Sequence, residues 1–261
     1  MGLKTAIVTG STGAIGKAIA RLILATDKFH VIMIARDESK ALKARDEIVK
    51  MTGLQSIDYY IADLSRKSEI FRLAGLIDGP VQVLVNNAAQ SPRQRGETPE
   101  GVEVQWATNV LGYFWMIEAF TPHLEAGAPA RVVNVASYWA GNLDLDDPEF
   151  RRRRYDNDES YRQSKQADRM LTVAFAEKLR SKGITVNSCH PGDVNSKLSN
   201  DLGFGGHETP DQGAATPVWL ATSQEVEGIT GKYFADRSEQ YCSFSKDKEE
   251  ILRLWDLLET Y

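Results

Sequence analysis

Short apolar runs alternate with longer amphipathic stretches along the first two-thirds of the chain. The runs are rich in β-branched and aromatic residues and are nearly continuous in their apolar character. Such runs are typical of parallel strands that are covered on both faces. The pattern predicts strands at Thr5–Thr9, His30–Ala35, Ile57–Ile61, Gln82–Asn86, Arg131–Ala136 and Ile184–Cys189, followed by a last short strand at Lys232–Ala235.

The stretches between these runs place their apolar residues on one helical face, as in Ile15–Ile23 and Met170–Leu179. A final helix is predicted over Lys246–Tyr261. The alternation predicts one α/β domain over residues 1–261, a doubly wound parallel sheet of about seven strands with helices on both faces. Gly141–Glu159 and Asp193–Asp211 are predicted to be loops, and the second is expected to be mobile.

The charge balance argues against nucleic-acid binding. The formal net charge is −5, and no basic stripe dominates the sequence. One basic run, Arg151–Arg154, is followed closely by Asp156, Asp158 and Glu159. We interpret this run as a locally neutralised loop rather than an anion site.

The cysteines and the length of the apolar runs bear on the compartment. Two cysteines are too few for a disulfide framework, and Cys189 in its apolar strand is expected to be buried. No run approaches the roughly 18–20 apolar residues that a membrane span needs. Because the chain also enters its first strand almost at once, we expect no signal peptide, no membrane anchor and a cytoplasmic protein.

A glycine-rich turn, Thr9–Gly16, joins the first strand to the first helix. Glycines 10, 13 and 16 allow a sharp turn and a close approach of the backbone to a pyrophosphate. The free N–H groups and the dipole of the following helix favour the anion. Taken alone, the motif also fits an ordinary strand-to-helix turn, so it indicates a dinucleotide only with further support.

The end of the second strand supplies that support and bears on which dinucleotide binds. Arg36 follows the strand, where an acidic residue usually accepts from the ribose 2′-hydroxyl of NAD and an arginine suits the 2′-phosphate of NADP. We therefore expect NADP(H), although a charge pair with Asp37 or Glu38 would also explain Arg36. Asp63 could accept from the adenine amine or could cap the next helix.

Tyr161 and Lys165 open a long helical pattern. Residues four apart lie on one face of a helix, so the phenol and the ammonium are neighbours. A phenol has an ordinary pKa of about 10, and an adjacent cation favours its ionised form. Ser137, at the end of the strand Arg131–Ala136, would complete a hydrogen-bonded site.

The chain resembles the short-chain dehydrogenase/reductase family from about Lys4 onward. The resemblance rests on motifs that occur in the family's order: Thr9–Gly16, Asp63-Leu64, Asn86-Asn87-Ala88-Ala89, Asn109 within Thr108–Gly112, Ser137, Tyr161-x-x-x-Lys165, and Pro191-Gly192. The resemblance implies a Rossmann-type fold and a hydride transfer between nicotinamide and an alcohol or carbonyl, without a metal or a covalent intermediate.

The resemblance also implies roles for individual residues. Tyr161 would be the general acid or base, Lys165 would tune it and hold the nicotinamide ribose, Ser137 would bind the substrate oxygen, and Asn109 would support a water chain to Lys165. A hydroxyl at Ser196 would lie near the nicotinamide carboxamide. The full set of expected cofactor contacts is Gly10, Ser11, Thr12, Gly13, Ala14, Ile15, Gly16, Arg36, Asp63, Leu64, Asn87, Ala88, Ala89, Tyr161, Lys165, Pro191, Gly192, Val194 and Ser196.

Within the family, the chain is most similar to the branch of retinol dehydrogenases, carbonyl reductases and protochlorophyllide reductases. The segments that carry this likeness are Ala35-Arg36-Asp37, Leu143–Asp147, His190–Val194 and Thr230–Phe234. Ala14 stands where single-domain members usually have glycine. Most of the retinol branch carries a membrane anchor, which we do not expect in this chain.

The substrate is expected to be a small carbonyl or alcohol, apolar or ring-bearing. Aromatic and aliphatic side chains in the segments around the site could line its cleft, or could simply pack under a loop: Tyr138, Trp139, Phe150, Tyr155, Leu198 and Phe204. A non-catalytic NADP(H)-binding sensor or scaffold is the alternative to an enzyme, but it would not need all of Asn109, Ser137, Tyr161 and Lys165. The resemblance also allows a homodimer.

Overall fold

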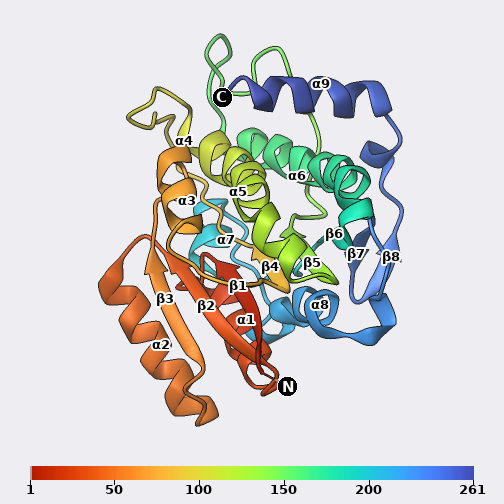
Figure 1. The fold of residues 1–261 in the computed structure, drawn as a ribbon. Helices are drawn as coiled ribbons and strands as arrows, with labels where there is room; N and C mark the ends of the chain where they lie inside the picture. Colours follow the sequence, from red (N-terminus) through yellow and green to blue (C-terminus); the bar gives the residue numbers. More distant parts are fainter. Residues whose placement is uncertain (1) are drawn as a thin grey trace.

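The structure, a computed structural model, describes residues 2–261 and centres on one eight-stranded sheet (Figure 1). The strand order is β3-β2-β1-β4-β5-β6-β7-β8, and the first seven strands are parallel. The predicted α/β fold with a doubly wound sheet is therefore confirmed. The strands are β1 (Lys4–Thr9), β2 (Phe29–Ala35), β3 (Ile57–Ile61), β4 (Val83–Asn86), β5 (Ala130–Val135), β6 (Ile184–Cys189), β7 (Tyr233–Ala235) and β8 (Ser238–Gln240).

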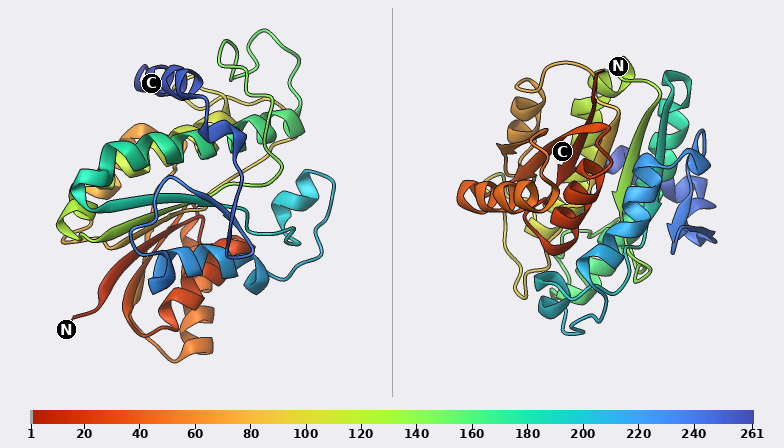
Figure 2. Two further views of the ribbon diagram at one scale, coloured as in Figure 1. Left: turned by 90° about the vertical axis from the view of Figure 1, so that its right-hand side faces the viewer. Right: turned by 90° about the horizontal axis from the view of Figure 1, so that it is seen from below.

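Helices cover both faces of this sheet (Figure 2). One face carries α1 (Ala14–Leu24), α2 (Glu38–Thr52) and α8 (Pro210–Thr222). The other carries α3 (Lys67–Ala74), α5 (Gly112–Ala126) and α6 (Asn157–Leu179), with α9 (Lys248–Glu259) packed outside α6. The shorter elements are α4 (Val104–Trp106), the π-helical turn η1 (Ala107–Leu111), α7 (Lys197–Asp201), and the 3₁₀ turns η2 (Arg180–Lys182), η3 (Gln224–Val226) and η4 (Ser243–Ser245).

The central strands are apolar because each contributes to two separate cores. In β1, Ile7 packs under the α3–α5–α6 layer, whereas Ala6 and Val8 pack under the α1–α2–α8 layer. All three side chains are fully buried. Successive strand residues point to opposite faces, so a strand buried on both sides cannot alternate with polar residues.

The eighth strand is the one element of the sheet that the apolar pattern did not predict. Asp236 and Arg237 have φ angles of 49° and 57°, and they form the two-residue turn of a hairpin between β7 and β8. The residues of β8 are exposed and polar, since the strand lies at the edge of the sheet. An edge strand of this kind carries no hydrophobic signal in the sequence.

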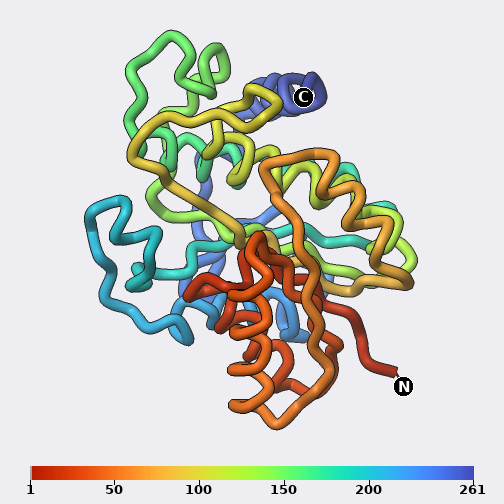
Figure 3. The backbone as a smooth tube through the Cα atoms, turned by 90° about the vertical axis from the view of Figure 1, so that its left-hand side faces the viewer, coloured from red at the N-terminus to blue at the C-terminus, as the bar shows by residue number. Residues whose placement is uncertain are grey.

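The two predicted loops project from the carboxyl end of the strands (Figure 3). Residues 141–156 contain no helix or strand, and the Asp147 carboxylate accepts the backbone N–H groups of Arg151, Arg152 and Arg153. Two guanidinium groups of the run also pair with carboxylates, Arg151 with Glu149 and Arg153 with Asp147, so the run is neutralised in part and mainly by acidic residues that precede it. The other segment is not a simple loop, because Ser196 caps the short helix α7 within it.

Two further expectations concern cysteines and membranes. Cys189 and Cys242 are both buried and unpaired, as expected for a chain without a disulfide framework. Among residues 2–261, no helix combines the length and the apolar character that a bilayer crossing would require.

Candidate active site

The carboxyl ends of β1 and β4 meet where the sheet order reverses, and there the chain makes very close backbone contacts. Gly10 has φ +63°, and a Cβ added there would lie 2.8 Å from Ala88 Cα. A Cβ on Gly16 would lie 2.3 Å from the Gly10 oxygen. Asn87 Nδ2 donates to the backbone oxygen of Thr9 at 2.9 Å. Open α/β sheets bind ligands at this kind of switch point.

The helix that follows the glycine turn has a free amino-terminal end. Its N-cap is Gly13, whose position provides no side-chain hydrogen bond, and no acidic residue lies in the first turn. By contrast, Asp37 and Asp156 cap α2 and α6 with their carboxylates. The uncapped N–H groups of α1 are therefore available to an anion.

Two of the predicted cofactor residues, Ser11 in the glycine turn and Asp63 after β3, make hydrogen bonds within the protein. Ser11 is fully buried, and both its N–H and its hydroxyl bond to the Ile34 oxygen. Asp63 does not cap α3, whose N-cap is Arg66; its Oδ1 accepts from the N–H and the hydroxyl of Ser65. The helix-cap explanation of Asp63 is therefore wrong, and the adenine contact stays a prediction.

Arg36 lies just after β2, at the same edge of the sheet. Its contact among the described residues is a long hydrogen bond, 3.5 Å, from Nη1 to Gln90 Oε1. The Asp37 carboxylate accepts the backbone N–H of Lys40 and does not pair with Arg36. The charge-pair explanation of Arg36 is thus not realised, and its guanidinium carries a positive charge at the open end of the strand.

Tyr161 and Ser137 share a cavity of about 410 Å³ at the carboxyl end of β5. The Ser137 Oγ accepts the backbone N–H of Trp139 at 3.1 Å, which leaves the hydroxyl proton free to donate. Burial raises the pKa of the Tyr161 phenol, and it outweighs the lowering influence of the Lys165 ammonium and the Ser137 hydroxyl. The expected lowering by Lys165 is present, but the net direction is upward because the phenol is almost fully buried.

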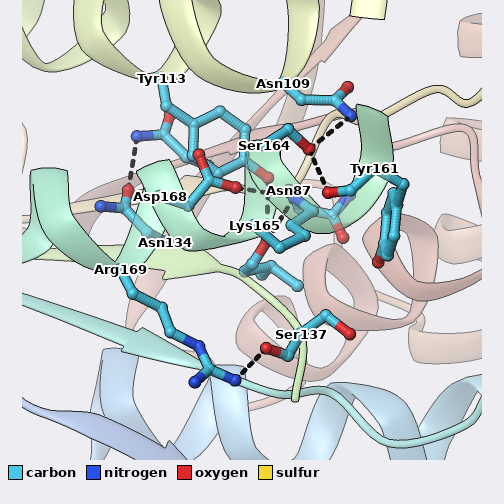
Figure 4. Close-up of polar contacts among 12 residues, drawn as sticks. Asn87, Asn109, Tyr113, Asn134, Ser137, Tyr161, Ser164, Lys165, Asp168 and Arg169 are labelled. Carbon is cyan, nitrogen blue, oxygen red and sulfur yellow. Dashed lines mark hydrogen bonds and ion pairs between the residues drawn. The ribbon is translucent and has the colours of Figure 1, made fainter. Parts of the chain in front are cut away.

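Lys165 lies one turn further along α6, at the centre of a buried polar cluster (Figure 4). Its Nζ donates to Asp168 Oδ2 at 2.8 Å and to the Val135 oxygen at 3.1 Å. Burial alone would lower the pKa of Lys165, but the neighbouring carboxylate raises it above its ordinary value. Burial also raises the pKa of Asp168. Asp168 was not predicted from the sequence, where it is one polar residue among many on this helix.

Asn109 holds the segment after β4 against α6. It lies in the π-helical turn η1, where its Oδ1 accepts the N–H of Gln90 and its Nδ2 donates to the Gln90 oxygen and the Ser164 hydroxyl. The Ser164 hydroxyl in turn donates to the backbone carbonyl oxygen of Tyr161 at 2.7 Å. The side chain of Asn109 therefore positions the start of α6, and its expected role in a water chain stays a prediction.

The segment after β6 closes the other side of the predicted cofactor cleft. Gly192 has φ +96°, and Val194 bridges to Glu208. A Cβ on Gly213 would touch Val194, Pro191 and Ile15, so this segment packs against the start of α1. The Ser196 hydroxyl accepts the N–H of Ser199 as a helix cap. Of the other expected cofactor residues, Leu64 follows β3 with a buried side chain, and Ala89 follows β4.

Part of the expected cavity lining is confirmed and part is not. Tyr138, Trp139 and Phe204 line the cavity at Tyr161, together with Asp193 and His207, which the aromatic pattern could not indicate. The other expected residues do not line it. Phe150 packs against Tyr155, whose hydroxyl donates to the Pro92 oxygen, and Leu198 lies in α7 away from the cavity.

Comparison with known proteins places the chain in a family. The short chain dehydrogenase family matches residues 4–203. Retinol dehydrogenase 13 of Mus musculus is 32% identical over 97% of this chain and 81% of its own length. The chloroplastic short-chain dehydrogenase TIC 32 B of Brassica napus is 33% identical over 97% of this chain and 86% of its own length.

Solved structures agree with these sequence relatives. A crystal structure of a protein from Mycobacterium paratuberculosis superposes with a TM-score of 0.82 at 27% identity, covering 98% of this chain and 92% of that one. Actinorhodin polyketide ketoreductase, solved with NADPH, gives a TM-score of 0.69 at 25% identity, covering 89% of this chain and 95% of its own.

The fold and the site define a nicotinamide-dependent oxidoreductase of the Rossmann type. The chain belongs to the short-chain dehydrogenase family, and its relatives include retinol dehydrogenases 13 and 14, as the resemblance predicted. Within residues 2–261, no group of His, Cys, Asp and Glu side chains has the arrangement of a metal site.

Proposed function

We propose that this protein is an NADP(H)-dependent enzyme that interconverts the carbonyl and alcohol forms of an apolar or ring-bearing small molecule. One observation carries the proposal. The Tyr161 phenol and the Ser137 hydroxyl line one cavity, and the Lys165 ammonium is held one helical turn away on the same helix. A binding module has no use for this combination.

The residues at the strand ends fit a dinucleotide with a 2′-phosphate. The uncapped start of α1 offers N–H groups to a pyrophosphate. Arg36 offers a guanidinium without a carboxylate partner at the place where a 2′-phosphate would lie. When bound, the nicotinamide would supply or accept the hydride.

The protein's own residues would handle the proton. The pKa of Tyr161 is raised by burial, so its phenol stays protonated at neutral pH and is ready to donate to a substrate oxygen. The Ser137 hydroxyl donates a hydrogen bond to the same oxygen and stabilises the charge that develops there. The positive charge of Lys165 favours the phenolate that remains after donation.

The cavity supports an apolar or ring-bearing substrate. Trp139 and Phe204 form an edge-to-face pair with centroids 5.9 Å apart, and the Trp139 ring lies 6.4 Å from the Tyr161 ring. Aromatic walls favour apolar and ring-bearing ligands. The retinol named in two sequence relatives belongs to this chemical class.

The test is NADPH oxidation against a panel of aldehydes, ketones and quinones. We expect turnover by the wild type, and a loss of kcat of about 100-fold or more in Tyr161→Phe, since a positioned general acid contributes that much. Tyr59→Phe on β3 is the matched control and keeps its rate. If the wild type and Tyr161→Phe are equally inert while both bind NADPH, the alternative of a non-catalytic NADP(H)-binding sensor or scaffold replaces the enzyme.

The choice of cofactor has its own test. Arg36→Ala removes the charge-assisted contact to a phosphate, which is worth roughly 1.5–3 kcal/mol. We expect the Kd for NADPH to rise about tenfold or more and the Kd for NADH to change little. Equal changes for the two nucleotides would exclude Arg36 as the 2′-phosphate contact.

A further inference from the structure

A second cavity lies beside the β7–β8 hairpin, under α6. Its volume is about 210 Å³, and its walls come from α6, β6, β7, β8 and η4. It shares no lining residue with the cavity at Tyr161. It is therefore a separate site, and neither the fold nor the proposed reaction accounts for it.

Three buried side chains in its wall carry polar atoms without a hydrogen-bond partner. Ser188 and Tyr233 are paired residues of β6 and β7, so their side chains leave the same face of the sheet. The Arg169 guanidinium lies 3.7 Å from the centroid of the Tyr233 ring. The three residues are 1%, 5% and 7% exposed, and the unpartnered atoms are Ser188 Oγ, Tyr233 Oη and Arg169 Nε.

These three atoms indicate that something polar completes the cavity. A buried polar atom left without a partner costs roughly 1–3 kcal/mol, and the three residues that carry these atoms all line this one cavity. All three can donate a hydrogen bond, and the guanidinium can only donate. The missing partner is thus an acceptor.

The charges around the cavity specify the kind of acceptor. The contacts of Arg169 among residues 2–261 are the Ser137 carbonyl and the rings of Tyr233 and Phe244, and none is a carboxylate. Its neighbour Asp168 pairs with Lys165 instead. A buried guanidinium without a counter-ion is costly.

The other charged residues in the wall of the cavity do not neutralise the Arg169 guanidinium. Lys232 and Lys246 are cationic, and the single carboxylate, Glu239, is 2.7 Å from the Lys232 ammonium. The cavity therefore carries three cations against one carboxylate, in a chain whose net charge is −5. This local excess of positive charge attracts an anion.

We propose that this cavity is a binding site for a small oxyanion, a carboxylate or phosphate group held by Arg169, Tyr233 and Ser188. Guanidinium and hydroxyl donors together match the several acceptor oxygens of such a group. The cavity is larger than the space that one water molecule needs, so a small anion fits with water around it.

The same arginine connects this site to the predicted active site. From α6, an Arg169 Nη2 donor reaches the backbone oxygen of Ser137, as Figure 4 shows. An anion bound at the unpartnered Arg169 Nε shares the guanidinium with that oxygen, and we expect it to alter the position of Ser137. Occupancy of the cavity should therefore change the rate of the proposed reaction, a consequence that rests on the proposed function.

The test is calorimetric titration of the full chain with inorganic phosphate and, separately, with acetate. We expect saturable binding of at least one, and the tighter probe identifies the chemical class. Arg169→Gln should weaken this binding about tenfold or more, because charge-assisted hydrogen bonds are lost. Arg253→Gln on α9 removes an exposed arginine that pairs with Asp146, and it should bind like the wild type.

A second arginine variant separates this site from the proposed cofactor site. Arg36→Gln removes phosphate binding at the end of β2, so saturable binding that survives in Arg36→Gln and is lost in Arg169→Gln belongs to the cavity. The proposal is overturned if neither anion binds saturably, or if Arg169→Gln binds as tightly as the wild type. In either case the cavity holds water only.

If Arg169→Gln does not fold, Tyr233→Phe provides a second test of anion binding in the cavity. It deletes a hydroxyl that has no partner within the described chain, so without an anion its melting temperature should equal or exceed that of the wild type. Added phosphate should raise its melting temperature less than that of the wild type. Equal increments in both proteins contradict the proposal.

Enzyme assays test the coupling. With NADPH and a carbonyl from the panel, phosphate should change kcat of the wild type and of Arg253→Gln but not of Arg169→Gln. Absence of any turnover counts against the proposed function, while the calorimetry still decides whether the cavity binds an anion.

Discussion

The buried pair of Lys165 and Asp168 offers the sharpest test of how the site is built. Their side chains are 2% and 0% exposed, and Nζ lies 2.8 Å from Oδ2. Asp168→Asn keeps the shape of the side chain but removes its charge. The Lys165 ammonium would then remain buried with the Val135 oxygen as its one other acceptor.

The expected loss of stability is large. Removing one partner of a buried ion pair costs about 3–5 kcal/mol, because the other charge stays in a medium of low dielectric constant. Whole proteins are stable by only about 5–15 kcal/mol. At about 2–4 °C per kcal/mol for a chain near this size, the melting temperature should fall by about 6–20 °C.

Urea unfolding followed by circular dichroism at pH 7 measures the change. The matched control is Asp46→Asn. The exposed carboxylate of Asp46 pairs with Arg45 at the surface, at 2.7 Å. Such a pair is worth less than about 1 kcal/mol. If Asp168→Asn costs no more than this control, the buried ion pair with Lys165 does not stabilise the fold.

A double variant separates the charge from the packing. Lys165→Met combined with Asp168→Asn removes both charges, so it should be less destabilised than the sum of the two single variants. Strict additivity would mean that the two side chains do not interact in the folded protein.

Three further variants test the glycine turn, a buried histidine and the wall of the cavity. Gly16→Val forces a side chain against the Gly10 oxygen, 2.3 Å from the added Cβ, and should abolish NADPH binding and lower the melting temperature. Burial lowers the pKa of His190 to about 4, so the folded protein binds fewer protons there than the unfolded chain, whose histidine has an ordinary pKa of about 6.5. The stabilisation that this group contributes is complete above pH 6.5 and is lost as the pH falls toward 4, by up to about 3 kcal/mol. In His190→Gln, the melting temperature should therefore depend less on pH across that window. If its dependence on pH is the same as in the wild type, other groups cause the loss of stability. Trp139→Ala should raise KM for ring-bearing carbonyls about tenfold through lost apolar contact, with NADPH affinity unchanged; a parallel loss of NADPH affinity would place Trp139 at the cofactor instead.

The sheet was predictable because its signal is local. Each of the seven parallel strands lies within one residue of its predicted bounds at both ends, since strands buried on both faces must be apolar throughout. The glycine turn and the spacing of Tyr161 and Lys165 are local as well. A turn geometry and a shared helical face follow from residues that are close in the sequence.

The tertiary structure decided which charged residues of α6 are buried. Asp168 and Arg169 look in the sequence like two ordinary polar positions of an amphipathic helix. Their surroundings come from β5, β7 and η4, which are distant in the chain, and only the packing of these elements removes both side chains from water.

The same packing set the pKa of Tyr161. Its neighbour Lys165 was visible from the spacing, and it does lower that pKa, but the desolvation that outweighs it depends on the closure of the loops around the cavity. By itself, therefore, the sequence determined the seven parallel strands, the glycine turn and the shared helical face of Tyr161 and Lys165. The tertiary structure alone decided which charged and phenolic side chains of α6 are buried, because that burial depends on contacts between segments far apart in the chain.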